Sequence, residues 1–191
     1  MIGFFDSGFG GLHVLRGITA RLPEYDYIYL GDSARAPYGP RSSDEVYSFT
    51  KQGVEFLFAH GAEIVVLACN TASSEALRKI QQGYQKEGSN KKVLGVLIPF
   101  AEAAAAHTKN KRVGVMATEG TVRSNAFPRE ITKVDSAIQV FQQSCPMLVP
   151  LVEAGQQDSE QADELIRTYV TPLLEKNIDT LVLGCTHYGM M

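Results

Sequence analysis

Two cysteines have the surroundings that acid/base chemistry needs. Cys69 and Cys185 each end an apolar run and are followed at once by small polar residues, in Ala68-Cys69-Asn70-Thr71 and Gly184-Cys185-Thr186-His187. A thiol at the end of a strand and aimed at a helix N-terminus has its pKa lowered from an ordinary value of about 8.5. Both cysteines are therefore predicted to be acid/base groups with a lowered pKa.

Two such thiols can do what one cannot. If Cys69 and Cys185 approach a shared site from opposite sides, one removes a proton from a carbon and the other delivers a proton to its opposite face, which inverts the stereocentre. One sulfur must then be a thiolate and the other a thiol. The Asn and Thr side chains beside the cysteines are suited to hold an α-carboxylate and an ammonium group. Asp6 and His187 are expected to tune the proton affinities.

Two further segments are predicted to contact a ligand. Asp6-Ser7-Gly8-Phe9-Gly10-Gly11 follows an apolar run and precedes a helical pattern, so its backbone and the helix N-terminus favour an anion. It matches no nucleotide-binding fingerprint. The polar segment 31–39 also follows an apolar run, and its Pro37-Tyr38-Gly39 is expected to present backbone amides and a phenol rim to a substrate.

The elements that would position these residues form an α/β pattern. The predicted strands are Ile2–Phe5, Tyr25–Leu30, Ile64–Ala68, Val93–Leu97, Val113–Ala117, Ile138–Phe141 and Thr180–Leu183. The predicted helices are Leu12–Arg21, Ser43–Ala59, Ser74–Tyr84, Phe100–His107, Ser124–Lys133 and Glu160–Lys176. Short apolar runs alternating with amphipathic stretches predict doubly wound, mainly parallel sheets covered on both faces.

Three boundary signals accompany this pattern. Ser42 and Glu45 have the spacing of a capping box at a helix start. Gly61 lies just beyond the end of the same helix, where a left-handed cap belongs. Pro172 lies inside the last helical pattern and is expected to kink or end it.

Two internal similarities predict two pseudo-symmetric domains, 1–98 and 99–191, with the active site in the cleft between them. Ile2–Ser7 resembles Val113–Thr118 at an offset of 111, and Val66–Thr71 resembles Val182–His187 at an offset of 116. Equal order and nearly equal offset indicate duplicated α/β units. The alternative is that both similarities are those of generic buried strands.

Composition excludes several classes of function. The chain has 191 residues and a net charge of −3, without a basic stripe, which disfavours nucleic acid and anionic membranes as partners. No apolar run approaches the ~20 residues of a membrane span, and no signal-type leader precedes Ile2, so a cytoplasmic protein is expected. Three cysteines without a Cys-x-x-Cys pair predict neither a disulfide framework nor a zinc site, and Cys145 is expected to be structural.

Five motifs together resemble the glutamate racemases of the aspartate/glutamate racemase superfamily. They are Asp6-Ser7-Gly8-x-Gly10-Gly11-Leu12, Gly31-Asp32-x-x-Arg35-x-Pro37-Tyr38-Gly39, Ala68-Cys69-Asn70-Thr71-Ala72-Ser73, Thr118-x-Gly120-Thr121-x-x-Ser124 and Gly184-Cys185-Thr186-His187-Tyr188. The resemblance spans the whole chain. It implies racemisation of L- and D-glutamate by two bases, with no cofactor and no metal, to supply D-glutamate for peptidoglycan and hence for cell-wall biogenesis and cell shape.

The resemblance also implies roles for single residues. Cys69 would act on the D-glutamate side and Cys185 on the L-glutamate side, with Asp6, His187 and Glu153 as accessory acid/base groups. The implied substrate contacts are Asp6, Ser7, Tyr38, Gly39, Asn70, Thr71, Thr118, Thr121, Thr186 and His187.

The chain departs from the family pattern in three places. Gly189 stands where the family has proline, Phe127 where tyrosine is common, and family members continue beyond the position of Met191. The first domain is therefore expected to lack its C-terminal return segment. A homodimer is one way to cover the apolar surface that this would leave.

Three alternatives stay open at the level of sequence. One is a cysteine hydrolase, with a single thiol activated by histidine. Another is a catalytically silent, truncated domain that binds glutamate. A metal site of Cys69, Cys185 and His187 is disfavoured, because ligands at i and i+2 of an extended segment lie on alternating faces.

Overall fold

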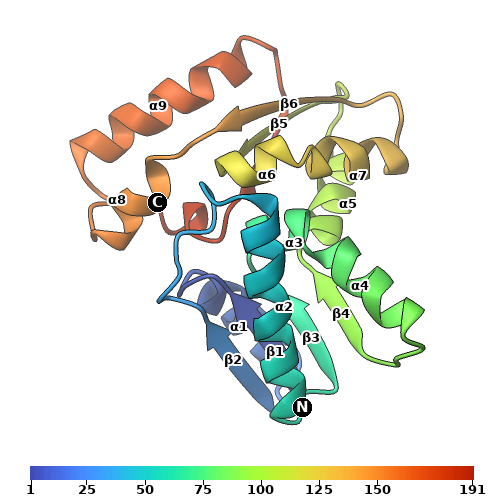
Figure 1. Ribbon diagram of the computed structural model, residues 1–191. Helices are drawn as coiled ribbons and strands as arrows, with labels where there is room; N and C mark the ends of the chain where they lie inside the picture. Colours follow the sequence, from blue (N-terminus) through green and yellow to red (C-terminus); the bar gives the residue numbers. More distant parts are fainter. The chain divides into compact units, whose positions relative to one another are not determined.

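The computed structural model describes residues 1–191, which divide into two compact units, Met1–Val96 and Leu97–Met191 (Figure 1). Each unit holds a sheet of parallel strands flanked by helices. This confirms the predicted α/β fold with parallel sheets. Pro99, the predicted domain boundary, lies in the first turn of a helix, a position that proline tolerates.

The first unit is built on a four-stranded sheet. Its strands are β1 (Ile2–Asp6), β2 (Tyr27–Gly31), β3 (Ile64–Leu67) and β4 (Lys92–Gly95). They run parallel in the order β2-β1-β3-β4. Asp6 pairs with Gly31, and Phe5 pairs with Leu67, so the segments that follow these strands all begin at one edge of the sheet.

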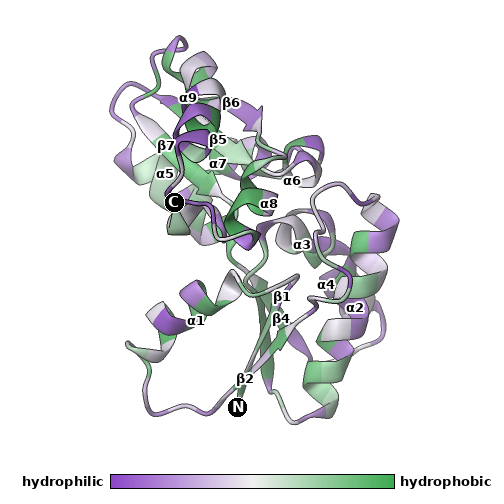
Figure 2. Ribbon diagram, turned by 90° about the vertical axis from the view of Figure 1, so that its left-hand side faces the viewer, coloured by the Kyte–Doolittle hydropathy of each residue, from purple (hydrophilic) through white to green (hydrophobic).

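Helices cover both faces of this sheet. They are α1 (Gly11–Thr19), α2 (Ser43–Ala59), α3 (Asn70–Glu75) and α4 (Leu77–Lys86). Figure 2 shows α1 on one side of the sheet and α2 and α4 on the other. The core lies between the sheet and helices α2 and α4. There Phe5, Leu67 and Val93 pack with Leu57 of α2 and Ile80 of α4. Burial of these apolar side chains orients the strand ends that carry the predicted site residues.

The ends of α2 are those that the sequence predicts. The Ser42 hydroxyl accepts from the Glu45 N–H at 3.3 Å, and the Glu45 carboxylate accepts from the Ser42 N–H at 3.1 Å, which confirms the capping box. Gly61 follows the helix with φ +93°, a left-handed conformation that glycine adopts without strain.

The second unit has a three-stranded sheet with the order β6-β5-β7, again parallel. Its strands are β5 (Arg112–Ala117), β6 (Gln139–Ser144) and β7 (Thr180–Gly184). Its helices are α5 (Leu97–His107), α6 (Glu119–Arg123), α7 (Ala126–Val134), α8 (Leu148–Glu153), α9 (Glu160–Leu174) and the 3₁₀ turn η1 (Tyr188–Met190). Within this unit α5 and α7 cover one face of the sheet and α9 the other (Figure 1).

One predicted helix is divided in two, and two short helices, α6 and α8, escaped prediction. The helix expected over 74–84 is α3 and α4, broken at Ala76, where φ is −114°. The helix expected over 124–133 is α7, which begins after Asn125 in the left-handed region at φ +51°. α6, at Glu119–Arg123, lies before the predicted start. Pro172 does not end α9, because the helix continues to Leu174 and the Glu175 N–H bonds to the Thr171 carbonyl at 3.0 Å.

The internal similarity extends to strand register. Gly3 of β1 pairs with Val65 of β3, and Gly114 of β5 pairs with Leu181 of β7. These are the pairs that the offsets of 111 and 116 relate. The strand order β2-β1-β3 is repeated as β6-β5-β7.

Helix packing repeats as well. A Cβ at Gly3 would lie 3.0 Å from the Ala62 Cβ and 3.3 Å from the Leu57 Cβ. A Cβ at Gly114 would lie 2.5 Å from the Ile178 Cδ1 and 3.4 Å from the Leu173 Cδ1. Leu57 and Ala62 correspond to Leu173 and Ile178 at the same offset of 116. The two units therefore resemble each other as whole β-α-β arrangements, and not only as generic buried strands.

Gly53 of α2 is required for packing, and its replacement tests the core of the first unit. A Cβ there would lie 2.3 Å from the Cε2 atom of Phe5, whose side chain is fully buried. We expect Gly53→Ala to destabilise the protein by ~1–3 kcal/mol through overpacking, although alanine favours the helix. Gly83→Ala in α4 is the matched control, because a Cβ at Gly83 would meet nothing within 4 Å, and it should stabilise by ~0.5–1 kcal/mol. Denaturant unfolding measures both, and equal stability of the two variants would contradict this packing.

Candidate functional site

Cys69 lies at the carboxyl edge of the first sheet, between β3 and α3. Its extended backbone makes it the N-cap of α3, and its Sγ accepts from the Ala72 N–H at 3.4 Å. The Ser7 hydroxyl lies 3.4 Å from the same sulfur. The residue is 5% exposed. Sulfur is not among the usual N-cap acceptors, and the predicted helix accordingly began only at Ser74, whereas α3 begins at Asn70.

The segment after β1 brings a carboxylate to this thiol. Asp6 is the last residue of β1, fully buried, and its Oδ2 accepts from the Gly8 N–H at 3.0 Å. Gly11 begins α1 so close to Asp6 that a Cβ there would lie 2.7 Å from the Asp6 Cβ and 3.0 Å from the Ala68 Cβ. The glycines of this segment therefore allow the helix to start against both the carboxylate and the cysteine strand.

The pKa of Cys69 moves in the direction opposite to the prediction. Burial, and then the charge of Asp6, raise the pKa of Cys69 to about 11, although hydrogen bonds from the Ser7 hydroxyl and the Ala72 N–H lower it in part. The predicted lowering is wrong for this thiol, because desolvation outweighs the donors at the start of α3. At neutral pH Cys69 is accordingly a protonated thiol.

Asn70 and Thr71 follow Cys69 and are both buried. The Asn70 side chain is 2% exposed, and neither its Nδ2 nor its Oδ1 has a hydrogen-bond partner. A buried amide without partners costs free energy, so such groups are retained where a polar ligand can satisfy them. Within the first unit, Asp6, Ser7, Cys69 and Asn70 thus gather at one strand edge, as the sequence predicts.

Cys185 occupies the equivalent place in the second unit, directly after β7. Its Sγ lies 3.8 Å from the His187 Nδ1, and the Thr186 hydroxyl lies 3.5 Å from the same nitrogen. The His187 Nε2 lies 3.5 Å from a Glu153 carboxylate oxygen on α8. Glu153, His187 and Cys185 thus form a series in which a buried imidazole lies between a carboxylate and a thiol.

Thr118 and Thr121 lie at the same edge. Thr118 is the N-cap of α6, and its hydroxyl accepts from the Thr121 N–H at 3.3 Å. Ala117 and Gly184 pair in the sheet, so Thr118 and Cys185 are the next residues of two adjacent strands. Thr118 corresponds to Ser7 at the offset of 111, and it therefore holds the position from which Ser7 contacts Cys69 in the first unit.

The Tyr38 side chain does not form the expected phenol rim. Its ring is 1% exposed, lies in the core of the first unit, and donates its hydroxyl proton to Asp32. Only the backbone of Tyr38 and Gly39 is left to serve a ligand. Asp32 and Arg35, which hold this segment in place, were not predicted as functional residues, since polar residues in a loop give no local signal of their partners.

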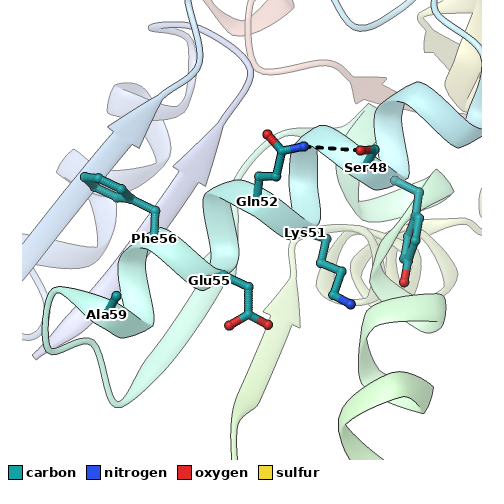
Figure 3. Close-up of a pocket in the computed structure, with 7 residues that line it drawn as sticks. Ser48, Lys51, Gln52, Glu55, Phe56 and Ala59 are labelled. Atoms are coloured by element: carbon teal, nitrogen blue, oxygen red, sulfur yellow. Dashed lines mark hydrogen bonds between the residues drawn. The ribbon is translucent and has the colours of Figure 1, made fainter.

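The third cysteine and the outer surface contribute nothing to this site. Cys145 is fully buried, and burial raises its pKa to about 12. No group of three His, Cys, Asp or Glu side chains is placed to hold a metal ion, and no helix is long and apolar enough to cross a membrane. A hollow on the outer face of α2, with Lys51, Glu55 and Phe56 in its wall, contains none of the predicted site residues (Figure 3).

The fold and these side chains define a class of α/β enzyme in which a duplicated parallel sheet carries a thiol at one strand end of each copy. Residues 10–191 match the Asp/Glu/Hydantoin racemase family, and the chain belongs to it. A glutamate racemase of Geobacter metallireducens is 45% identical over 190 residues, which are 100% of this chain and 68% of that protein.

Solved structures agree with this assignment. The glutamate racemase isoform RacE1 of Bacillus anthracis has a TM-score of 0.92 and 39% identity, covering 100% of this chain and 70% of that one. The glutamate racemase of Francisella tularensis, in complex with D-glutamate, has a TM-score of 0.89 and 33% identity, covering 99% and 69%. The resemblance to glutamate racemases is confirmed.

The environment of Cys69 leads to a prediction about its ionisation. We expect Asp6→Asn to lower the pKa of Cys69, because the asparagine keeps an oxygen for the Gly8 N–H and removes the charge that opposes the thiolate. Ser7→Ala should raise it, because it removes a hydrogen bond to the sulfur. The ultraviolet absorbance of the thiolate, titrated in a Cys145→Ala, Cys185→Ser background, measures both. An unchanged titration in Asp6→Asn would show that burial alone sets this pKa.

Proposed function

We propose that this protein interconverts L- and D-glutamate without a cofactor, by proton transfer at Cα between two thiols. The observation that carries the proposal is the repeat: matching strands β3 and β7 lead into Cys69 and Cys185 through the same register and the same helix packing. Membership of the racemase family and the glutamate racemases among its relatives support the substrate.

The reaction needs one acid/base group on each face of the substrate Cα. We assign Cys185 to the face from which L-glutamate loses its proton and Cys69 to the face from which D-glutamate loses it. The carbanion that forms between the two transfers has its charge on the α-carboxylate, so hydrogen-bond donors fixed around that carboxylate lower the barrier. Asn70 is the best candidate, because its buried amide has donors and an acceptor without partners. Ser7, Thr71, Thr118, Thr121 and Thr186 are proposed as further contacts, together with the Tyr38–Gly39 backbone.

The two thiols have unlike neighbours, and this sets the resting protonation state in the proposed mechanism. Burial and the Asp6 carboxylate keep Cys69 protonated. Cys185 lies beside the His187 imidazole, on whose other side lies the Glu153 carboxylate, and we assign Cys185 the role of the base. The resting protein then presents a base on the Cys185 side and an acid on the Cys69 side, the combination that L-glutamate requires.

The biological role follows from the product. We propose that the D-glutamate formed is used to build peptidoglycan, and that the protein thereby contributes to cell-wall biogenesis and cell shape from the cytoplasm. The homodimer also stays a prediction, to be checked by sedimentation of the purified chain.

A second candidate is favoured by one observation. Cys185, His187 and Glu153 are also the parts of a thiol nucleophile activated by an oriented histidine, as in cysteine hydrolases. That reaction has no use for the equivalent thiol at Cys69. A hydrolase would release a hydrolysis product and leave the Cα–H of glutamate unexchanged.

Isotope exchange tests the two-thiol mechanism directly. In deuterium oxide, initial conversion of L-glutamate should give D-glutamate deuterated at Cα, while the remaining L-glutamate keeps its proton, because the proton removed and the one delivered reside on different sulfurs. Chiral chromatography with mass spectrometry follows both pools. Equal labelling of substrate and product from the first turnover would show a single base, and the absence of any conversion with glutamate still bound would identify a silent binding domain.

Single substitutions test the two assignments. We expect Cys69→Ser and Cys185→Ser each to lower kcat/KM by about 10²- to 10⁴-fold, in both directions, because each thiol is the acid in one direction and the base in the other. Cys145→Ala is the control and should keep its kcat/KM with reduced stability, since it removes a buried sulfur outside the proposed site. Circular dichroism at the start of each reaction gives the rates. A variant of Cys69 or Cys185 that racemises at the unmodified rate would overturn the mechanism.

A further inference from the structure

We propose that Asp32 is a positioning residue, which holds the Tyr38–Gly39 backbone in its substrate-binding conformation through the Tyr38 hydroxyl and the Arg35 guanidinium. The proposal rests on the function proposed above and adds a residue that does not touch the substrate. It concerns the segment between β2 and α2, residues 32–42.

Asp32 joins this segment to the strand edge that carries Asp6. Its backbone N–H donates to the Asp6 carbonyl at 2.9 Å, which continues the pairing of β1 with β2 by one residue. Its Oδ2 accepts from the Arg35 Nε at 2.7 Å and also from the Tyr38 hydroxyl. The Asp32 side chain is 11% exposed, so water competes little for these bonds. One carboxylate therefore ties two points of the loop to the edge where Asp6 and Ser7 begin the neighbouring segment.

Tyr38 is fixed from two sides. The centre of its ring lies 6.2 Å from that of Phe5 and 6.0 Å from that of Phe49, both at tilted angles, and the ring packs into the core. Burial and the hydrogen bond to Asp32 raise the pKa of Tyr38, so the phenol stays protonated and remains a donor. Because its ring is packed and its hydroxyl is bonded, the Tyr38 side chain is held in one rotamer. This in turn holds the Tyr38 backbone.

Arg35 extends the support to α2. Its guanidinium lies 4.3 Å from the centre of the Phe49 ring, and its Nη1 donates to the Gln52 Oε1 at 2.9 Å. Gln52 in turn donates to the Ser48 hydroxyl at 3.3 Å, one turn earlier on the outer face of α2 (Figure 3). The arginine is thereby clamped between the Asp32 carboxylate and a helix that is itself rigidly packed.

The far end of the loop is closed by Arg41. Its Nε donates to the Arg35 carbonyl at 2.8 Å, and its backbone N–H donates to the Tyr38 carbonyl at 3.1 Å. The two ends of the segment are thus fixed, and Tyr38 and Gly39 lie between them. A site that binds a ligand through backbone groups needs a fixed loop. A mobile loop would lose conformational entropy on binding, and this loss would weaken the affinity.

Kinetics distinguish positioning from a general structural role. We expect Asp32→Asn and Tyr38→Phe each to raise KM for both enantiomers by about tenfold while kcat changes by less than about threefold, since the loop binds substrate and does not reach the reacting proton. The double variant should be little worse than either single one, because both break the same interaction. Tyr27→Phe is the control: it removes a tyrosine hydroxyl that donates to the Leu22 carbonyl at the other end of β2, and its KM should not change.

Amide hydrogen exchange of the ligand-free protein is a second measurement, and it does not depend on racemisation. The Arg35 N–H bonds to the Asp32 carbonyl and the Arg41 N–H to the Tyr38 carbonyl, and both should exchange at least about tenfold faster in Asp32→Asn and Tyr38→Phe but not in Tyr27→Phe. Unchanged exchange, or a fall in kcat with KM unaltered, would overturn the role of Asp32. If the unmodified chain does not racemise glutamate, the proposed function fails. Calorimetric affinity for L- and D-glutamate then replaces KM, and equal affinity in Asp32→Asn would overturn the positioning role as well.

Discussion

In each unit, side chains from a helix and the turn after it pack closely on a glycine of the strand beside the cysteine strand, and the place of each cysteine depends on this packing. Leu57 and Ala62 press on Gly3 in the first unit, as Leu173 and Ile178 press on Gly114 in the second. From these contacts the chain runs directly into the strand that ends at the thiol, and the number of residues between contact and cysteine is the same in both units. A side chain at either glycine would push the helix outward and shift that strand along or away from its neighbour. The sulfur would move with it, so the reactive atoms are positioned by apolar packing well away from any polar group of the site.

Sequence patterns predicted all seven strands, because buried parallel strands are short apolar runs that stand out against their flanks. Helix boundaries were predicted where a local side chain caps the backbone, as at Ser42, and missed where tertiary structure decides. The break at Ala76 has no local signature, and it divides a helix that periodicity alone would continue. The helix α8 carries a proline within six residues, too short a segment for a period to be read.

Residues of the site were predictable where the chemistry lies in a contiguous motif, and their energetics were not. Cys69, Asp6 and Asn70 follow strands in sequence, so their common edge follows from the parallel topology. The sign of the pKa change at Cys69 depends on burial by the whole unit and on a carboxylate 63 positions away in the chain, neither of which a spacing can express. The same holds for Asp32, whose bonds to Tyr38 and Arg35 make an ordinary polar loop into a fixed one.

The duplicated fold places unlike residues around its two thiols. L- and D-glutamate are mirror images with equal free energies in solution, so the equilibrium constant is unity and kcat/KM must be the same in both directions. This equality constrains the whole reaction and says nothing about the two thiols separately. If their surroundings were identical, the two singly protonated forms of the protein would be equally populated, and only half of the molecules would be competent for either enantiomer. Asp6 beside Cys69 removes that degeneracy, since its charge favours the protonated thiol there. In the proposed mechanism the repeated backbone supplies the two sulfurs, and the unlike residues around them decide which sulfur holds the shared proton in the resting protein.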